Sequence, residues 1–296
     1  TANRWIPKVL MLPEEQKKQE LINYIEKWHN HGILQVAMAP STPFACTPDY
    51  LDWVKKVAEE YGMQIYVHVS ETSWEVQQSL QESGTTPLAY LDSLNFLSRP
   101  IAAVHCVHLT EAETALAKEK GVTVIYNPKS NAKLGSGIAP IVKYLEKGIP
   151  VTLATDGAAS NDLLDMFEEI RFGAMLQKAG CENPSVITAP DMLKLATESG
   201  AKMLGIDGGV LEEGKLADLI IVNPEMVHMQ PIHNVVQQLV YCGKASDVET
   251  VIIDGKVVLE NKQFATVDEE KILKRAIELG LEKYAESRKH AMAADF

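Results

Sequence analysis

The sequence has no long hydrophobic run and little cysteine. No uninterrupted apolar stretch approaches the ~20 residues that a membrane-spanning helix needs, which argues against a membrane-spanning protein. The four cysteines lie far apart without CxxC spacing, so a metal site of that type is not expected. No secretory signal pattern opens the chain. We therefore expect a reduced, cytoplasmic protein.

Positive charge is also scarce. The chain carries 28 Lys and Arg against 40 Asp and Glu, for a formal net charge of −12. This balance argues against a nucleic acid or an anionic membrane as partner. With 46% hydrophobic and 23% charged residues among 296, the composition is that of a soluble globular protein with one large or two modest domains.

Short apolar runs alternate with helical patterns through the first two thirds of the chain. Alternation of this kind predicts parallel strands joined by crossover helices, an α/β fold. Thr110 and Glu113 form a capping-box pattern that predicts a helix start. Oxygen-bearing residues 160–162 are candidate caps for a helix expected at 163–178. The strands are expected at 33–39, 64–69, 101–106, 122–126 and 151–155.

Polar side chains cluster where these strands end. The strand at 64–69 ends with His68 and Val69 and is followed by Glu71. The strand at 101–106 contains His105, and Asp156 follows the strand at 151–155. Because carboxyl ends of parallel strands meet at one edge, these four side chains are predicted to converge. His and Asp are good Zn²⁺ ligands, and such a metal lowers the pKa of bound water toward ~7. Glu71 could then move a proton.

Each of these residues has an ordinary explanation when taken alone. Asp156-Gly157 is common turn chemistry, His68 and His105 could be core histidines, and Glu71 could be an acid at a helix N-terminus. Their joint occurrence at three strand ends favours a functional site.

Other candidate motifs are weaker. His29 and His31 have metal-pair spacing but precede a strand, and we interpret them as a solvated helix end. The loop 130–137 lacks the GK[ST] ending of a phosphate-binding loop, so we interpret it as a flexible wall of the site. His108 is interpreted as structural.

Five ordered motifs together resemble the amidohydrolase superfamily, in particular its 5-methylthioadenosine/S-adenosylhomocysteine deaminase and chlorohydrolase branch. The resemblance covers nearly the whole chain. It implies a metal-bearing (β/α)8 TIM-type barrel with a small β-sandwich: residues 1–207 as a partial barrel, 208–266 as part of the sandwich, and 267–296 as a C-terminal helix and tail. The motifs are VHVSET (67–72), AAVHCVHL (102–109), NPKSNAKLGSGIAP (127–140), TLATDGAASND (152–162) and GVLEEGKLADLIIV (209–222).

The resemblance also implies roles. His68 and Asp156 would bind one divalent metal, most simply Zn, with Fe, Ni or Mn as alternatives. Asp156 would take a proton from the metal-bound water, Glu71 would protonate a ring nitrogen, and His105 would polarise the site near the hydroxide. The implied reaction is hydrolytic deamination of a purine or related amino-heterocycle.

The chain departs from the family pattern in two places. The His-x-His pair of the first barrel strand is missing, and the predicted strands match barrel strands four to eight. The chain starts at Thr1 rather than Met. We therefore expect a fragment comprising the C-terminal two thirds of an enzyme, with weak or no metal binding and little activity by itself. Strands at the edges of an incomplete barrel would be unpaired, and such edges can pair with a second copy of the chain. A homo-oligomer is therefore one alternative.

The second departure concerns the substrate. Ser41 stands where methylthioadenosine-type enzymes carry a histidine that contacts the nucleoside. Ser41 and Glu71 are the expected substrate-binding residues, and the amino-heterocycle itself is left open. A triazine chlorohydrolase, a guanine-type deaminase, and a non-catalytic binding or structural module are the alternatives.

Overall fold

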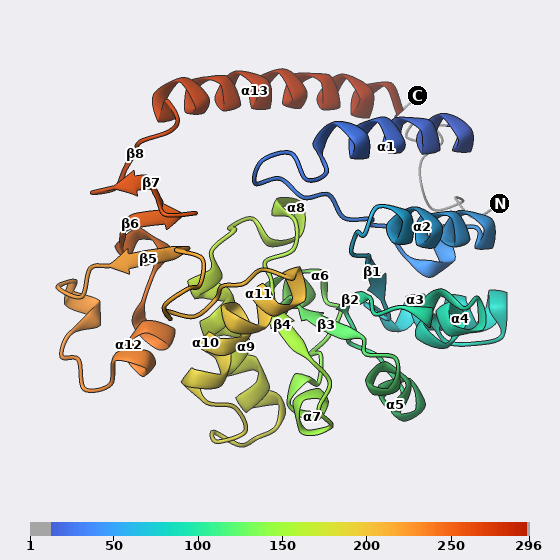
Figure 1. The fold of residues 1–296 in the computed structure, drawn as a ribbon, viewed down its shortest axis with the longest axis horizontal. Helices are drawn as coiled ribbons and strands as arrows, with labels where there is room; N and C mark the ends of the chain where they lie inside the picture. The colour runs from blue at the N-terminus through green and yellow to red at the C-terminus, as the bar shows by residue number, and fades with distance from the viewer. Residues whose placement is uncertain (1–12, 295–296) are drawn as a thin grey trace. The chain divides into compact units, whose positions relative to one another are not determined.

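A computed structural model describes residues 13–294, with side chains to residue 286. In this part of the chain, four parallel strands form a sheet in the order β1-β2-β3-β4 (Figure 1). At least one helix connects each strand to the next, as parallel pairing requires. The expected α/β fold is confirmed. The strands are β1 (Tyr66–Val69), β2 (Ala102–His105), β3 (Thr123–Tyr126) and β4 (Val151–Leu153).

The prediction of a continuous strand at 33–39 is wrong. This segment has two isolated bridges instead, an antiparallel one between Leu34 and His31 and a parallel one between Met38 and Ile65. The chain still runs beside β1, because the His68 amide donates to the Ser41 carbonyl at 3.0 Å. Pro40 has no amide hydrogen to donate, so a continuous ladder cannot form through this segment.

Helices surround the sheet and bury its apolar side chains (Figure 1). The capping box of Thr110 and Glu113 is confirmed at the start of α5. The helices of this part are α1 (Glu14–Trp28), α2 (Pro48–Glu60), α3 (Ser73–Ser83), α4 (Pro87–Ser93), α5 (Glu111–Glu119), α6 (Pro128–Leu134), α7 (Ile141–Glu146), α8 (Ala158–Asn161), α9 (Met166–Gly180), α10 (Ala189–Ala196), α11 (Glu198–Leu204) and α12 (Val235–Cys242), with 3₁₀ turns η2 (Pro43–Ala45) and η3 (Phe96–Ser98).

The helix expected to start at 163 starts later. Asp165 is the N-cap of α9, and its side chain accepts from the amides of Phe167 and Glu168. Ser160 and Asn161 belong instead to α8, and their side chains bond to Asp156 and Glu169. The prediction that residues 160–162 cap this helix is therefore wrong, because Ser160 Oγ donates to Asp156 and Asn161 Nδ2 donates to Glu169.

The chain divides into two compact units. One comprises Pro231–Ala245 and Thr1–Val210, of which residues 13 onward are described; the other comprises Leu211–Gln230 and Ser246–Phe296. The first unit runs to Val210, three residues beyond the expected boundary at 207/208. It also includes residues 231–245, since α12 packs against α9 and α10.

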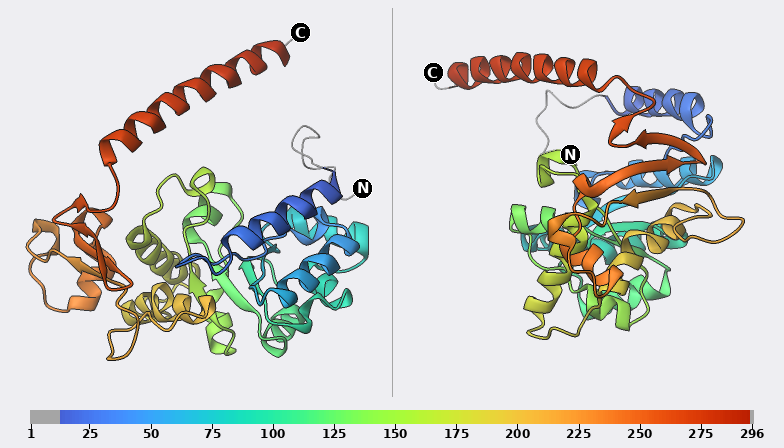
Figure 2. Two further views of the ribbon diagram at one scale, coloured as in Figure 1. Left: turned by 45° about the horizontal axis from the view of Figure 1, so that its top comes forward. Right: turned by 90° about the vertical axis from the view of Figure 1, so that its left-hand side faces the viewer.

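The second unit contains an antiparallel sheet in the order β5-β6-β7-β8. Asp254 and Gly255, with φ of 51° and 71°, form the tight turn between β6 and β7. The helix α13 (Glu269–Ala294) is continuous (Figure 2), so the helix expected within residues 267–296 extends as far as residue 294. The remaining elements are β5 (Leu219–Val222), β6 (Val248–Ile253), β7 (Lys256–Glu260), β8 (Gln263–Phe264), η4 (Val227–Met229) and η5 (Ala245–Asp247).

None of the helices between residues 13 and 294 has the length and apolarity to cross a membrane.

Candidate functional site

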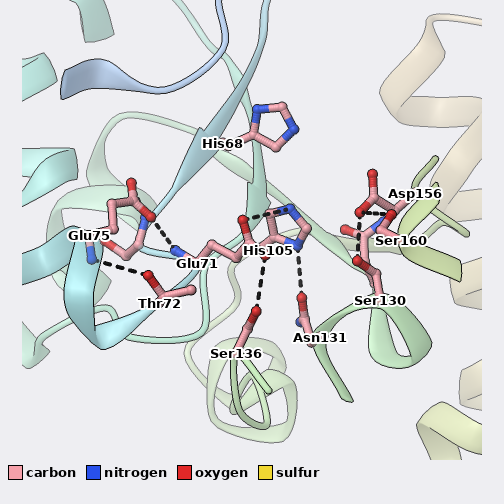
Figure 3. A network of polar contacts seen from close by, with 12 residues as sticks. His68, Glu71, Thr72, Glu75, His105, Ser130, Asn131, Ser136, Asp156 and Ser160 are labelled. Atoms are coloured by element: carbon pink, nitrogen blue, oxygen red, sulfur yellow. Dashed lines mark hydrogen bonds and ion pairs between the residues drawn. The ribbon is translucent and has the colours of Figure 1, made fainter. Parts of the chain in front are cut away.

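The structure brings the predicted side chains to the carboxyl ends of the parallel strands. His68 lies in β1, His105 ends β2, and Asp156 lies three residues beyond β4. The His68 and His105 rings are stacked, with centroids 5.5 Å apart and an interplanar angle of 23°. The carboxylate of Glu71 lies 3.7 Å from His105 Nε2 (Figure 3). The predicted convergence of these residues is observed.

The backbone at these strand ends is left-handed. Ser70, His105, Cys106 and Asp156 have φ of 51°, 73°, 48° and 63°, a region that costs a non-glycine residue roughly 1–3 kcal/mol. Such conformations persist where surrounding contacts impose them, and they concentrate at active sites. The sharp turns direct the side chains of His105 and Asp156 over the sheet edge.

His68 is oriented by the segment beside β1. Its Nδ1 lies 2.6 Å from the Ser41 carbonyl oxygen, which can only accept, so Nδ1 carries a proton. In the neutral form of the ring, Nε2 then has a lone pair. A carbonyl on one ring nitrogen is the usual support of a metal-binding histidine. Ser41 thus contributes through its backbone. The predicted substrate contact of its side chain stays a prediction.

Asp156 is surrounded by donors. Its Oδ1 accepts from the Gly157 amide at 2.7 Å, and its Oδ2 accepts from Ser130 Oγ at 2.6 Å and Ser160 Oγ at 2.8 Å. Partial burial acts to raise the pKa of Asp156, but these hydrogen bonds outweigh it and leave the pKa below its ordinary value. The carboxylate is therefore ionised at neutral pH.

His105 is almost completely buried, and burial lowers its pKa despite the nearby Glu71 carboxylate. Its Nδ1 lies 2.8 Å from Asn131 Oδ1. Glu71 accepts a 3.0 Å hydrogen bond from Ser136 Oγ. The site thus places a neutral imidazole beside a carboxylate.

Glu75 is a site residue that the sequence analysis missed. It lies buried under the turn that carries Glu71, and its two carboxylate oxygens accept from the amides of Ser70 and Glu71 at 3.1 and 2.7 Å. Burial raises the pKa of Glu75 to about 7. The signal was present in Thr72-x-x-Glu75, because Thr72 Oγ1 caps α3 by accepting from the Glu75 amide.

The interpretation of loop 130–137 as a flexible wall is wrong. Residues up to 134 form α6, and Ser130, Asn131 and Ser136 are buried, with 0, 1 and 4% exposure. Each of the three contacts a different predicted site residue. A run of Ser, Asn and Gly suggested flexibility, but these short polar side chains are the ones that hydrogen-bond at close range.

Two histidines outside the strand ends, His29 and His108, have structural partners. His29 accepts from the Val36 amide at 3.1 Å and contacts the Tyr61 carbonyl at 3.1 Å, so it links α1 to α2 and to the chain before β1 rather than binding metal with His31. His108 Nε2 lies 2.8 Å from the Ser136 carbonyl, as expected of a structural residue.

The described residues supply only part of a metal-binding set. His68 has a supported ring and a free Nε2, and Asp156 is ionised. Between residues 13 and 286, however, no three His, Cys, Asp or Glu side chains are grouped so as to hold a metal ion. A zinc site in a protein usually has three or four protein ligands, so these residues do not complete one.

The chain was compared with protein families and with proteins of known structure. The model of the amidohydrolase family matches residues 9–258. The chain is 43% identical over 265 residues to a 5-methylthioadenosine/S-adenosylhomocysteine deaminase of Dictyoglomus thermophilum, a match that covers 87% of this chain and 62% of the relative. This chain thus spans about three fifths of that relative's length.

Two solved structures are similar over most of the chain. An adenosine deaminase from Xanthomonas campestris with bound zinc has a TM-score of 0.85 and 34% identity, covering 90% of this chain and 61% of that one. An atrazine chlorohydrolase from Arthrobacter aurescens, complexed with zinc, has a TM-score of 0.85 and 26% identity, covering 90% and 60%.

The family match spans both units of the fold, and the deaminase match exceeds 40% identity. The motifs that carry the resemblance include the strand ends where His68, His105 and Asp156 converge. This chain therefore belongs to the amidohydrolase family.

Proposed function

We propose that the protein to which this chain belongs is a hydrolytic deaminase of a purine-type amino-heterocycle. The observation that carries the proposal is the convergence of Glu71, His105 and Asp156 at one sheet edge, with Asp156 ionised and His105 neutral. The 43% identity to a methylthioadenosine-type deaminase supports the same reaction.

Hydrolytic deamination replaces an amino group with the hydroxyl of water and releases ammonia, so protons must move at two places. A base takes a proton from the attacking water, and an acid protonates the ring nitrogen and the amino group, which departs as ammonia. The ionised Asp156 is suited to be the base. Glu71 lies beside the His105 ring and can carry a proton to the heterocycle. His105 would polarise the site near the attacking water.

We propose that His68 and Asp156 contribute two ligands to a zinc ion completed by residues outside the described set. A zinc ion bound at such a site would lower the pKa of a water molecule bound to it. Both solved relatives named above carry zinc, and the Ser41 carbonyl gives His68 the orientation of a metal ligand. Iron, nickel or manganese are the other ions to compare.

The substrate proposal is an adenine-type nucleoside, by analogy with the relatives' names. Cytoplasmic location is consistent with the described cysteines, which are all free. A non-catalytic binding module is the second candidate, because the described residues do not group three metal-binding side chains.

The test uses the purified chain and a chimera in which the part of the Dictyoglomus relative outside the match precedes it. Both are assayed with zinc for ammonia release from adenosine, 5-methylthioadenosine, guanine and atrazine. We expect the chimera to deaminate an adenine nucleoside, and E71Q or D156N to reduce kcat by roughly 100-fold or more, as loss of acid–base catalysis does. A folded, zinc-loaded chimera without turnover on any compound would favour the binding module.

A further inference from the structure

One short segment contacts three of the site side chains. This segment, residues 127–137, contains α6 and the turn after it and is called the α6 segment below (Figure 3). Ser130 and Asn131 contact Asp156 and His105 from its first half. Ser136 contacts Glu71 from its end.

The position of the α6 segment is fixed from outside the site. The Lys129 amide donates to Glu169 Oε2 of α9 at 3.3 Å, and Glu169 itself is fully buried. His108 binds the Ser136 carbonyl at 2.8 Å. The Ser136 amide donates to the Asn131 carbonyl at 2.8 Å, which closes the turn after α6. The segment therefore has its geometry before any substrate arrives.

The contact between Asn131 and His105 selects one form of the imidazole. In the observed orientation the Asn131 side chain presents its carbonyl oxygen to His105 Nδ1. An amide oxygen only accepts, so Nδ1 must carry the proton and Nε2 is left with a lone pair when the ring is neutral. That Nε2 faces the Glu71 carboxylate, 3.7 Å away.

We propose that the α6 segment is a positioning element for the site, in which Asn131 fixes His105 as the Nδ1–H tautomer and Ser136 fixes the Glu71 carboxylate. Its meaning for catalysis rests on the proposed function, but the geometry does not. Asn131 and Ser136 are positioning residues, since each acts through another side chain. A lone pair on Nε2 directed at Glu71 lets the imidazole accept a proton or a substrate N–H between the two groups.

The tautomer can be measured directly on the unmodified 296-residue chain. The ¹⁵N shifts of its histidine ring nitrogens, recorded at one neutral pH, distinguish Nδ1–H from Nε2–H. We expect His105 to be the Nδ1–H tautomer. An Nε2–H ring would mean that Asn131 donates rather than accepts, and would overturn the proposal. This result does not depend on turnover, so it is independent of the outcome of the deaminase assay.

Matched variants separate positioning from general stability. Asn131→Leu keeps the approximate size of the side chain and removes the hydrogen-bond acceptor. The ratio of the two His105 tautomers should therefore shift about tenfold toward Nε2–H, which corresponds to the free energy of one buried hydrogen bond. Asn131→Asp keeps an acceptor and should keep Nδ1 protonated. The His108 ring signals report whether the fold is native. An unchanged His105 ring in a native Asn131→Leu variant contradicts the proposal.

The Ser136 contact is tested in the same way. The carboxyl ¹³C signal of Glu71 should shift in Ser136→Ala, which loses the donor, and should return toward the original value in Ser136→Thr, which restores a hydroxyl. The Glu75 carboxyl signal is the internal control, because its partners are the amides of Ser70 and Glu71. A Glu71 signal that is the same in all three proteins overturns this half of the proposal.

Discussion

Burial strongly changes the pKa of the Glu75 carboxyl group. It is 4% exposed beneath the Glu71 turn, and burial raises its pKa from 4.5 to about 7. A carboxyl group whose folded pKa is above its unfolded value favours the folded state fully below the unfolded pKa. That contribution is lost as the pH rises from about 4.5 through about 7. The Glu75 carboxylate therefore makes the protein less stable at alkaline pH.

We predict that Glu75→Gln flattens this pH dependence. Between pH 5 and pH 8 the free energy of unfolding of the unmodified chain should fall by roughly 2–3 kcal/mol more than that of the variant, at about 1.4 kcal/mol per pKa unit. Urea unfolding at the two pH values measures the difference. Glu119→Gln, at an exposed position on α5, is the control and should follow the unmodified chain. Equal slopes for Glu75→Gln and the unmodified chain would refute the prediction.

For single residues, the sequence predicted which side chains form the site, but it did not predict the contacts that those side chains make. The strand ends identified His68, His105 and Asp156 because polar residues interrupt apolar runs there. The left-handed backbone at His105 and Asp156 was not predictable, because even Asp and His, which are enriched in this region, adopt it uncommonly and surrounding contacts must impose it.

Helix α9 approaches the site at a glycine. A Cβ at Gly173 would lie 3.0 Å from the Tyr126 ring, 3.1 Å from Met192 and 3.2 Å from Pro128 at the start of α6. All three neighbours belong to packed elements, so the helix can come this close only without a side chain. Gly173 therefore sets the distance between α9 and α6.

We predict that Gly173→Ala destabilises the protein. Alanine in a helix gains up to about 1 kcal/mol over glycine, but overpacking costs about 1–3 kcal/mol, so a net loss of up to about 2 kcal/mol is expected. Chemical denaturation measures it. At Gly180, the last residue of α9, a Cβ would meet ordinary contacts at 3.5 and 3.8 Å, and Gly180→Ala should be neutral or stabilising. Equal free energies of unfolding for Gly173→Ala and Gly180→Ala would contradict the prediction that, of these two positions, only 173 is tightly packed.

Elements were predicted where local signals agree. The Thr110 capping box was identified from the sequence and is confirmed. The start of α9 was misplaced because several cap-type residues compete between 160 and 165. Bonds of Ser160 and Asn161 within the site decide that competition.

For the whole molecule, we predict that the chain does not retain a full equivalent of zinc through dialysis. His68 and Asp156 provide two ligands, and the described residues group no third His, Cys, Asp or Glu with them, whereas stable zinc sites use three or four. Metal analysis and calorimetric titration of the purified chain measure this. The chimera described above is the comparison and should hold close to one equivalent. Tight stoichiometric binding by the chain alone would contradict the prediction.

The sequence by itself determined the family, the alternation of parallel strands with helices, and the chemical character of the strand ends. These follow from local composition and order along the chain. Only the tertiary structure decided that residues 127–137 are a buried support rather than a flexible wall, and that Glu75 lies beneath the site. The support role of residues 127–137 depends on contacts with residues far away in sequence, and the role of Glu75 depends on its burial. Neither the partners nor the burial of a side chain can be read from the pattern of a short segment.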